Sequence, residues 1–163
     1  MPIHDYFRAN DAKIAMRAMR LGGPLGPNPA FDGVATKNIN PPVILGKLSA
    51  FIRIKPWEVR TVSIAVFWSP GPEPVTKEKY NQLPEDSPWR HGPCLFELDN
   101  EARNTLASVD DARISQLAMM WANIVEFRGH ARVESMVTLI NDLVGLARRA
   151  RDAGDHLYCW SSL

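Results

Sequence analysis

The chain has 163 residues, of which 45% are hydrophobic and 23% charged, proportions that are typical of a folded globular protein and exclude disorder over most of the length. A length between roughly 100 and 200 residues favours one domain with one core, so we expect residues 1–163 to form a single domain. Nineteen Lys and Arg against eighteen Asp and Glu give a formal charge of +1, which argues against the broad basic surface that binds nucleic acid.

The sequence shows neither a typical export signal nor a typical membrane-spanning segment. Residues 1–5 hold no charged leader followed by an apolar segment, and no stretch approaches the roughly 18 apolar residues of a membrane span. We therefore expect a cytoplasmic protein that does not contact a membrane. Cys94 and Cys159 lie in stretches typical of buried strands, so we expect both to be reduced core residues.

The first predicted elements are a strand and a helix. Two aromatic residues within residues 5–9 indicate a short edge strand. A helix follows, capped by Asn10 or Asp11 and ending near Arg20, because a Gly-Gly-Pro sequence comes directly after it.

The next segments predict strand, helix and strand in turn. Residues 31–39 follow a Pro- and Gly-rich loop and hold a short strand. Asn40 and two prolines after it begin a helix over residues 43–54, since proline suits the first helical turn. Residues 59–68 end in a continuous apolar run, which is typical of a central strand covered on both faces.

Residues 69–93 interrupt this pattern, because they contain six prolines and almost no apolar periodicity. We expect a long surface excursion there. A strand resumes at residues 94–98, and helices follow at residues 101–106 and 111–126.

The longest predicted helix spans residues 133–153 and ends at Gly154, which favours the left-handed conformation of a helix C-terminus. A short terminal strand follows at residues 157–160. Helices outnumber the unevenly spaced strands, so we predict an α+β fold with a small mixed sheet and helices packed mainly on one face.

Contiguous catalytic motifs are absent from the sequence. It has no G-x-G-x-x-G, Walker loop, G-x-S-x-G, H-E-x-x-H or C-x-x-C. None of the four histidines has a second His at metal-ligand spacing. We therefore expect no metal and no cofactor.

Two aromatic residues lie within the Pro-rich excursion. Tyr80 and Trp89 are surrounded by polar sequence, where no apolar pattern explains the burial of a large ring. Exposed Tyr and Trp often anchor interfaces, so these residues and the adjacent Arg90 are the candidate partner-binding residues. The alternative is that the rings hold the excursion against the body of the protein.

A second candidate site uses titratable residues that only the fold could bring together. Asp32 and Lys37 are five residues apart, which places them on opposite faces of a strand. The candidate pocket residues are Asp32, Lys37, Glu126, His130 and His156.

Four segments resemble a family of uncharacterised actinobacterial proteins: residues 4–9 (HDYFRA), 31–34 (FDGV), 45–48 (LGKL) and 153–160 (AGDHLYCW). The resemblance covers most of the chain outside residues 69–93. More distantly, the aromatic first strand and the last helix with its short terminal strand are similar to the YfbM-like domain of unknown function. The resemblance implies an α+β fold and no catalytic residue.

These observations favour a non-enzymatic protein-binding module, such as an immunity- or antitoxin-like bacterial protein. The alternative is a small enzyme or ligand-binding domain with a pocket between sheet and helices. An exposed apolar patch around Tyr80 and Trp89 would favour the first, and a polar-lined pocket with convergent titratable groups the second. A homodimer is a third alternative, if the terminal strand has an unpaired edge.

Overall fold

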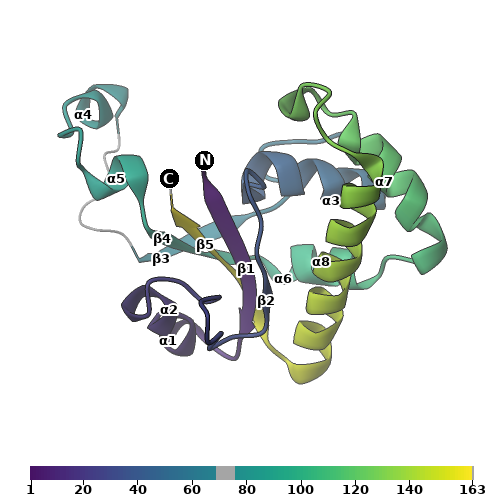
Figure 1. Cartoon of the computed structure of the whole chain (residues 1–163), viewed down its shortest axis with the longest axis horizontal. Helices are drawn as coiled ribbons and strands as arrows, with labels where there is room; N and C mark the ends of the chain where they lie inside the picture. Colours follow the sequence, from purple (N-terminus) through teal and green to yellow (C-terminus); the bar gives the residue numbers. More distant parts are fainter. Residues whose placement is uncertain (69–75, 163) are drawn as a thin grey trace.

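The computed structural model describes residues 1–68 and 76–162, which build one five-stranded sheet with helices on both faces (Figure 1). The strands stand in the order β2-β1-β5-β4-β3, and every neighbouring pair is antiparallel. Their bounds are β1 Ile3–Ala9, β2 Gly33–Val34, β3 Ile64–Trp68, β4 Cys94–Leu98 and β5 His156–Ser162. The predicted α+β class is confirmed. The sheet is antiparallel rather than mixed, because strand direction depends on the end of the sheet to which each connection returns, which local sequence does not encode.

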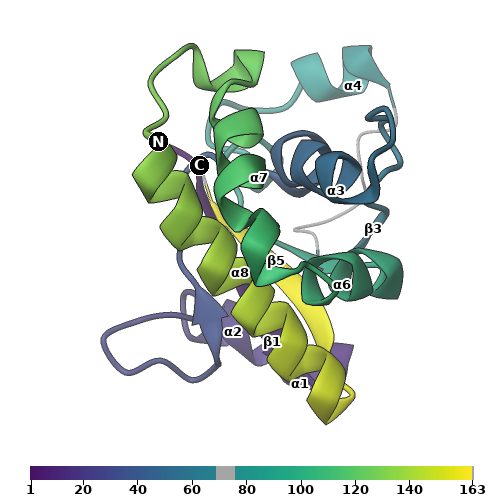
Figure 2. The same cartoon turned by 90° about the vertical axis from the view of Figure 1, so that its right-hand side faces the viewer.

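The longer helices cover one face of the sheet, as predicted, and two short helices lie against the other (Figures 1 and 2). The larger layer contains the π-helix η1 Pro41–Leu45, α3 Gly46–Arg53, α6 Asn100–Ala107, α7 Ile114–Ala122 and α8 Val133–Ala153. The opposite face carries α1 Ala12–Ala15 and α2 Arg17–Arg20. Within the described residues, no helix combines the length and the apolar character that crossing a membrane requires.

Capping residues fix where several helices begin and end. The side chain of Asp11 accepts a hydrogen bond from the Ile14 amide at 2.8 Å, and Asn40 accepts one from the Val43 amide at 3.0 Å. These bonds satisfy amides that have no partner within the helix. Gly154 ends α8 with a φ of 70°, as its position predicts.

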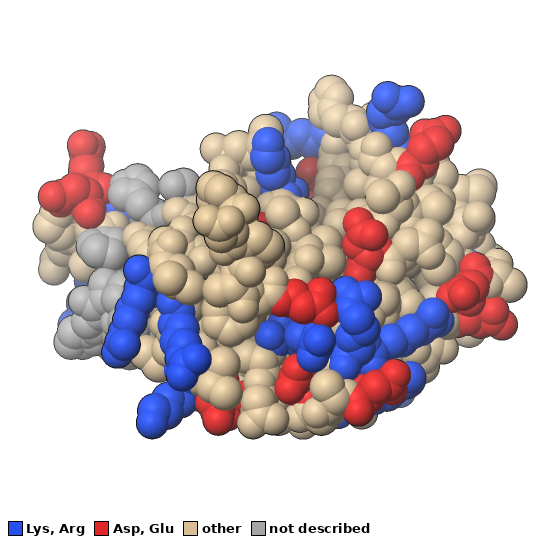
Figure 3. Space-filling model, turned by 60° about the horizontal axis from the view of Figure 1, so that its bottom comes forward, with Lys and Arg blue, Asp and Glu red and all other residues tan. Residues whose placement is uncertain are grey.

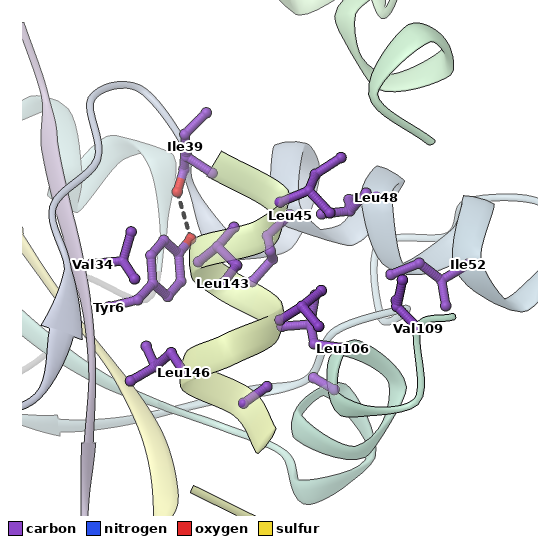
Figure 4. Close-up of a cluster of buried hydrophobic side chains, with 14 of the residues drawn as sticks. Tyr6, Val34, Ile39, Leu45, Leu48, Ile52, Leu106, Val109, Leu143 and Leu146 are labelled. Carbon is purple, nitrogen blue, oxygen red and sulfur yellow. Dashed lines mark hydrogen bonds between the residues drawn. The ribbon is translucent and has the colours of Figure 1, made fainter. Parts of the chain in front are cut away.

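The main core lies between the sheet and the longer helices (Figure 4). Tyr6 projects from β1 among apolar side chains of α3 and α8, and Leu48 and Leu143 are 0% and 2% exposed. The Tyr6 hydroxyl donates a hydrogen bond to the Ile39 carbonyl at 2.5 Å. A smaller cluster on the other face contains Phe7, Leu95, Tyr158 and Trp160.

Two predictions about strand position are wrong, and the condition stated for a homodimer is not met. The first strand, β1, is internal rather than an edge, and β3 is an edge strand rather than a central one. The terminal strand β5 lies between β1 and β4 and pairs with both, so it offers no free edge for a homodimer. An apolar run shows that a strand is covered, but not how many strands pair with it.

Several predicted elements are shorter or divided. Residues 111–126 form the 3-10 helix η2 Asp111–Arg113, then α7, and then the 3-10 helix η3 Val125–Phe127 after a break at residues 123–124. The strand expected at residues 31–39 pairs as β2 over two residues, with one further bridge at Lys37. Residues 69–75 of the Pro-rich excursion lie outside the described residues, and the rest of it contains α4 Lys77–Asn81 and α5 Pro88–His91.

Candidate functional site

Asp32 belongs to an ion-pair network rather than to a pocket. Its carboxylate accepts hydrogen bonds from Arg8 Nε at 2.7 Å and from two nitrogens of Arg149 at 2.7 and 2.9 Å. Arg8 also pairs with Asp155 at 2.7 Å. The bonds from Arg149, and then those from Arg8, lower the pKa of Asp32. This network joins the β1–β2 region to the end of α8. Figure 3 shows that acidic and basic side chains also lie against one another more widely over one face of the molecule.

His156 is also apart from the other candidate residues. Its Nδ1 lies 2.9 Å from the Asn100 side-chain oxygen and 3.5 Å from a carboxylate oxygen of Glu97. These contacts connect the start of β5 to β4 and α6.

Lys37, Glu126 and His130 line one pocket of about 480 Å³. Lys37 comes from the connection between β2 and η1, and the other two come from η3 and the turn before α8. The structure thus brings Lys37 together with Glu126 and His130, which are close to each other but far from Lys37 in the sequence. Apolar side chains complete the wall, among them Ile39, Ile44, Phe127, Met136 and Leu139.

The backbone on both sides of this pocket adopts the left-handed conformation. Asn38 has a φ of 61° and Arg128 one of 50°, and both residues line the pocket. Positive φ is uncommon for residues other than glycine. The Asn38 amide donates to the Pro2 carbonyl at 2.9 Å, and Phe127 packs edge-on against the Trp121 ring at 5.9 Å. Packing and hydrogen bonds therefore hold the two sides in place.

The charge of the pocket is positive. Among the described residues that line it, Glu126 is the only acid, and Lys47 binds that carboxylate at 2.5 Å. The hydrogen bond from Lys47 lowers the pKa of Glu126, so this side chain is an anion that already has a cation as its partner. Lys37 and Arg128 add two further positive charges.

Tyr80 and Arg90 contact each other within the excursion, whereas Trp89 lies against the body of the protein. Tyr80 is 39% exposed, and the Arg90 guanidinium lies 5.2 Å from the centre of its ring. Arg90 also donates to the backbone carbonyls of Tyr80, Asn81 and Leu83. Trp89 is half-buried and lines a small second pocket. Arg90 therefore organises the excursion internally, and the three residues do not form one exposed apolar patch.

An exposed groove that the sequence did not predict lies between α3 and α7, where apolar side chains are bordered by Lys55, Arg113 and Gln116. Ile54 is 83% exposed and Met120 40% exposed, and both line a hollow of about 450 Å³ together with Phe51 and Pro56. Ile54 ends α3 with a φ of 54°, which is unfavourable for a β-branched side chain. At about 100° per residue Ile54 lies about 120° around the helix from Leu48, off the buried stripe, but one apolar residue at a helix end does not by itself indicate an exposed groove.

The described residues contain no group of three His, Cys, Asp or Glu side chains that could hold a metal ion. The fold and the pocket thus define an α+β protein with an apolar cavity bordered by cations. No known protein family, curated protein or solved structure matches the chain. The resemblance to an actinobacterial family and to the YfbM-like domain stays a prediction.

Proposed function

We propose that the protein is a ligand-binding domain and that its pocket at Lys37, Arg128 and His130 takes a small organic anion. One observation carries the proposal: the cationic side chains of Lys37 and Arg128 line a mainly apolar cavity of about 480 Å³ in which the acid, Glu126, is already paired with Lys47. Pockets of roughly 300 to 1,000 Å³ with apolar walls and a few polar groups are typical of small-molecule sites.

The pocket favours an amphipathic ligand that has one anionic end and one apolar end. A carboxylate or sulfonate would accept hydrogen bonds from Lys37 or Arg128, and such charge-assisted bonds are about twice as strong as neutral ones. An alkyl or aryl body would cover the side chains of Phe127, Met136 and Leu139 and remove apolar surface from water.

A matched pair of probes tests this proposal. Isothermal titration calorimetry with 4-phenylbutyrate and with its neutral analogue 4-phenylbutanol should show tighter binding of the anion. Lys37→Gln and Arg128→Gln should each lower the affinity for the anion by about tenfold, the effect of losing one charged hydrogen bond. Lys77→Gln is the control, because it removes the same charge from exposed α4. Equal binding of both probes, or equal losses in the control, would exclude the proposal.

A protein-binding module is the second candidate, and the exposed groove at Ile54 favours it. Contiguous exposed apolar surface often marks a site of protein interaction. The masking of another protein by an immunity- or antitoxin-like protein needs only such a surface. A strained residue that remains exposed is also consistent with a functional role.

Ile54→Asn separates binding from stability. Asn tolerates the left-handed conformation better than Ile, so the variant should be more stable by about 0.5–1 kcal/mol while it loses the apolar contact. Affinity purification from the native host should then recover fewer partners with Ile54→Asn than with the wild type. Tyr80→Ala and Trp89→Ala in the same experiment test the excursion. Recovery of the same partners with Ile54→Asn would rule out the groove as the binding surface.

A further inference from the structure

Three polar side chains from three neighbouring strands lie in a row at one end of the sheet. Ser161 of β5 pairs directly with His4 of β1 on one side and with Cys94 of β4 on the other. Directly opposed residues have their Cβ atoms about 4.5 to 5.5 Å apart and their side chains on the same face. The three residues line a pocket of about 260 Å³, which we call the strand-end pocket.

The walls of the strand-end pocket are mainly apolar. Pro41 and Pro42 of η1 form one side, and Phe96 and Trp89 contribute aromatic rings. The segment after α5 lies directly on β5, because a Cβ atom at Gly92 would be 2.7 Å from the Ser161 carbonyl oxygen. In Figure 1 the two ends of the chain lie side by side near α5, where these elements meet.

The polar groups of the strand-end pocket are uncharged at neutral pH. His4 is 9% exposed, and burial lowers its pKa, so the imidazole is neutral at pH 7. Burial raises the pKa of the Cys94 thiol, which disfavours the nucleophilic thiolate. His4 Nδ1 and Ser161 Oγ are 2.8 Å apart and form a hydrogen bond. An ion entering this pocket would lose its hydration and meet no opposite charge among these groups.

We propose that the strand-end pocket binds a neutral, mainly aromatic small molecule with one hydrogen-bonding group, which meets the His4–Ser161 pair. Aromatic rings pack favourably against Trp89 and Phe96. An apolar cavity of about 150 Å³ holds benzene, so about 260 Å³ accommodates a ring system of roughly the size of indole. The pocket at Lys37, Arg128 and His130, which we call the organic-anion pocket, differs from this site in its residues, its charge and its ligand.

Wild-type protein with indole as the probe provides the first test. In two-dimensional amide NMR spectra, indole should shift the signals of His4, Cys94 and Ser161, whereas indole-3-acetate should leave them unchanged because it carries a charge. Shifts confined to residues around Ile54 or Lys37, or no shifts at millimolar indole, would overturn the proposal.

Variants provide the second test. Ser161→Ala should lower the affinity for indole by about tenfold, because the ligand loses one of its two polar partners. Cys94→Leu should abolish indole binding by filling the cavity. Ser115→Ala is the control, since it changes an exposed serine of α7 outside both pockets and should leave indole affinity unchanged. Circular dichroism establishes that each variant is folded. Folded Ser161→Ala and Cys94→Leu proteins that bind indole as tightly as the wild type would refute the site, whatever the result with 4-phenylbutyrate.

Discussion

Replacement of Tyr6 by Phe removes a single buried hydroxyl and leaves the ring in place. Tyr6 is 1% exposed and Ile39 2% exposed, and the hydroxyl donates to the Ile39 carbonyl (Figure 4). Without that donor the carbonyl loses a buried partner, at a cost of about 1–3 kcal/mol. We expect a loss of about 2 kcal/mol in the free energy of unfolding. In a protein of this size that corresponds to a fall in Tm of about 4–8 °C.

The same substitution should also change the response to alkali. Burial raises the pKa of Tyr6 well above its usual value of 10. The unfolded chain therefore ionises this tyrosine first, and the wild type loses stability as the pH rises above about 10. Tyr6→Phe has no hydroxyl to ionise at this position. The difference in unfolding free energy between the two proteins should therefore shrink between pH 10 and pH 11.

Urea unfolding followed by circular dichroism measures both effects. Tyr158→Phe is the control, because Tyr158 is also buried, at 0% exposed, but its hydroxyl donates at 3.2 Å to Glu97, whose carboxylate is partly exposed to water. Water can replace part of that bond, so we expect a loss below about 1 kcal/mol. A loss below about 0.5 kcal/mol for Tyr6→Phe, or an equal loss in the control, would refute the reasoning.

Three further predictions concern charge and backbone packing. Asp32→Asn should cost about 1 kcal/mol at pH 7, since solvent screens this partly exposed ion pair. The arginine partners lower the pKa of Asp32 in the wild type. The difference in unfolding free energy between wild type and variant, measured by urea unfolding, should therefore shrink as the pH falls below about 4. Gly33→Ala should lower the free energy of unfolding by at least about 2 kcal/mol, because the new Cβ would overlap the Tyr6 carbonyl oxygen, whereas Gly26→Ala, with nothing within 4 Å, should change it by less than about 0.5 kcal/mol. Burial lowers the pKa of His4, so the wild type should lose stability as the pH falls below about 6.5, and His4→Gln should flatten that decline in Tm.

Local sequence was sufficient to predict most helices and helix ends. Asn40 and Gly154 act as the predicted caps, because capping depends on residues within one turn. Strand positions in the sheet were not predictable in the same way. The apolar residues at 64–68 indicate a strand, but its place at the edge depends on the absence of another strand beyond β3 among the described residues.

For the pocket residues, the chemistry was likewise predictable from the sequence, but the spatial arrangement was not. Lys37, Glu126 and His130 were candidates because of their chemistry, but their convergence depends on the position of η3 against the connection between β2 and η1. The row of His4, Ser161 and Cys94 was missed because it arises from register across three strands, and sequence separation hides such a row.

The pairing of β1 with β5 also determines when the sheet can form. Ile3 pairs with Ser162 and Ala9 with His156, so the contacts at the centre of the sheet join residues about 150 positions apart. Contacts of such long range slow folding, because a very large loop must close before they contribute stability. On a ribosome, β1 would have to wait, without its principal partner, until β5 had left the exit tunnel. The helices of the larger layer can form earlier, but the sheet that they cover is completed only when synthesis of β5 is finished.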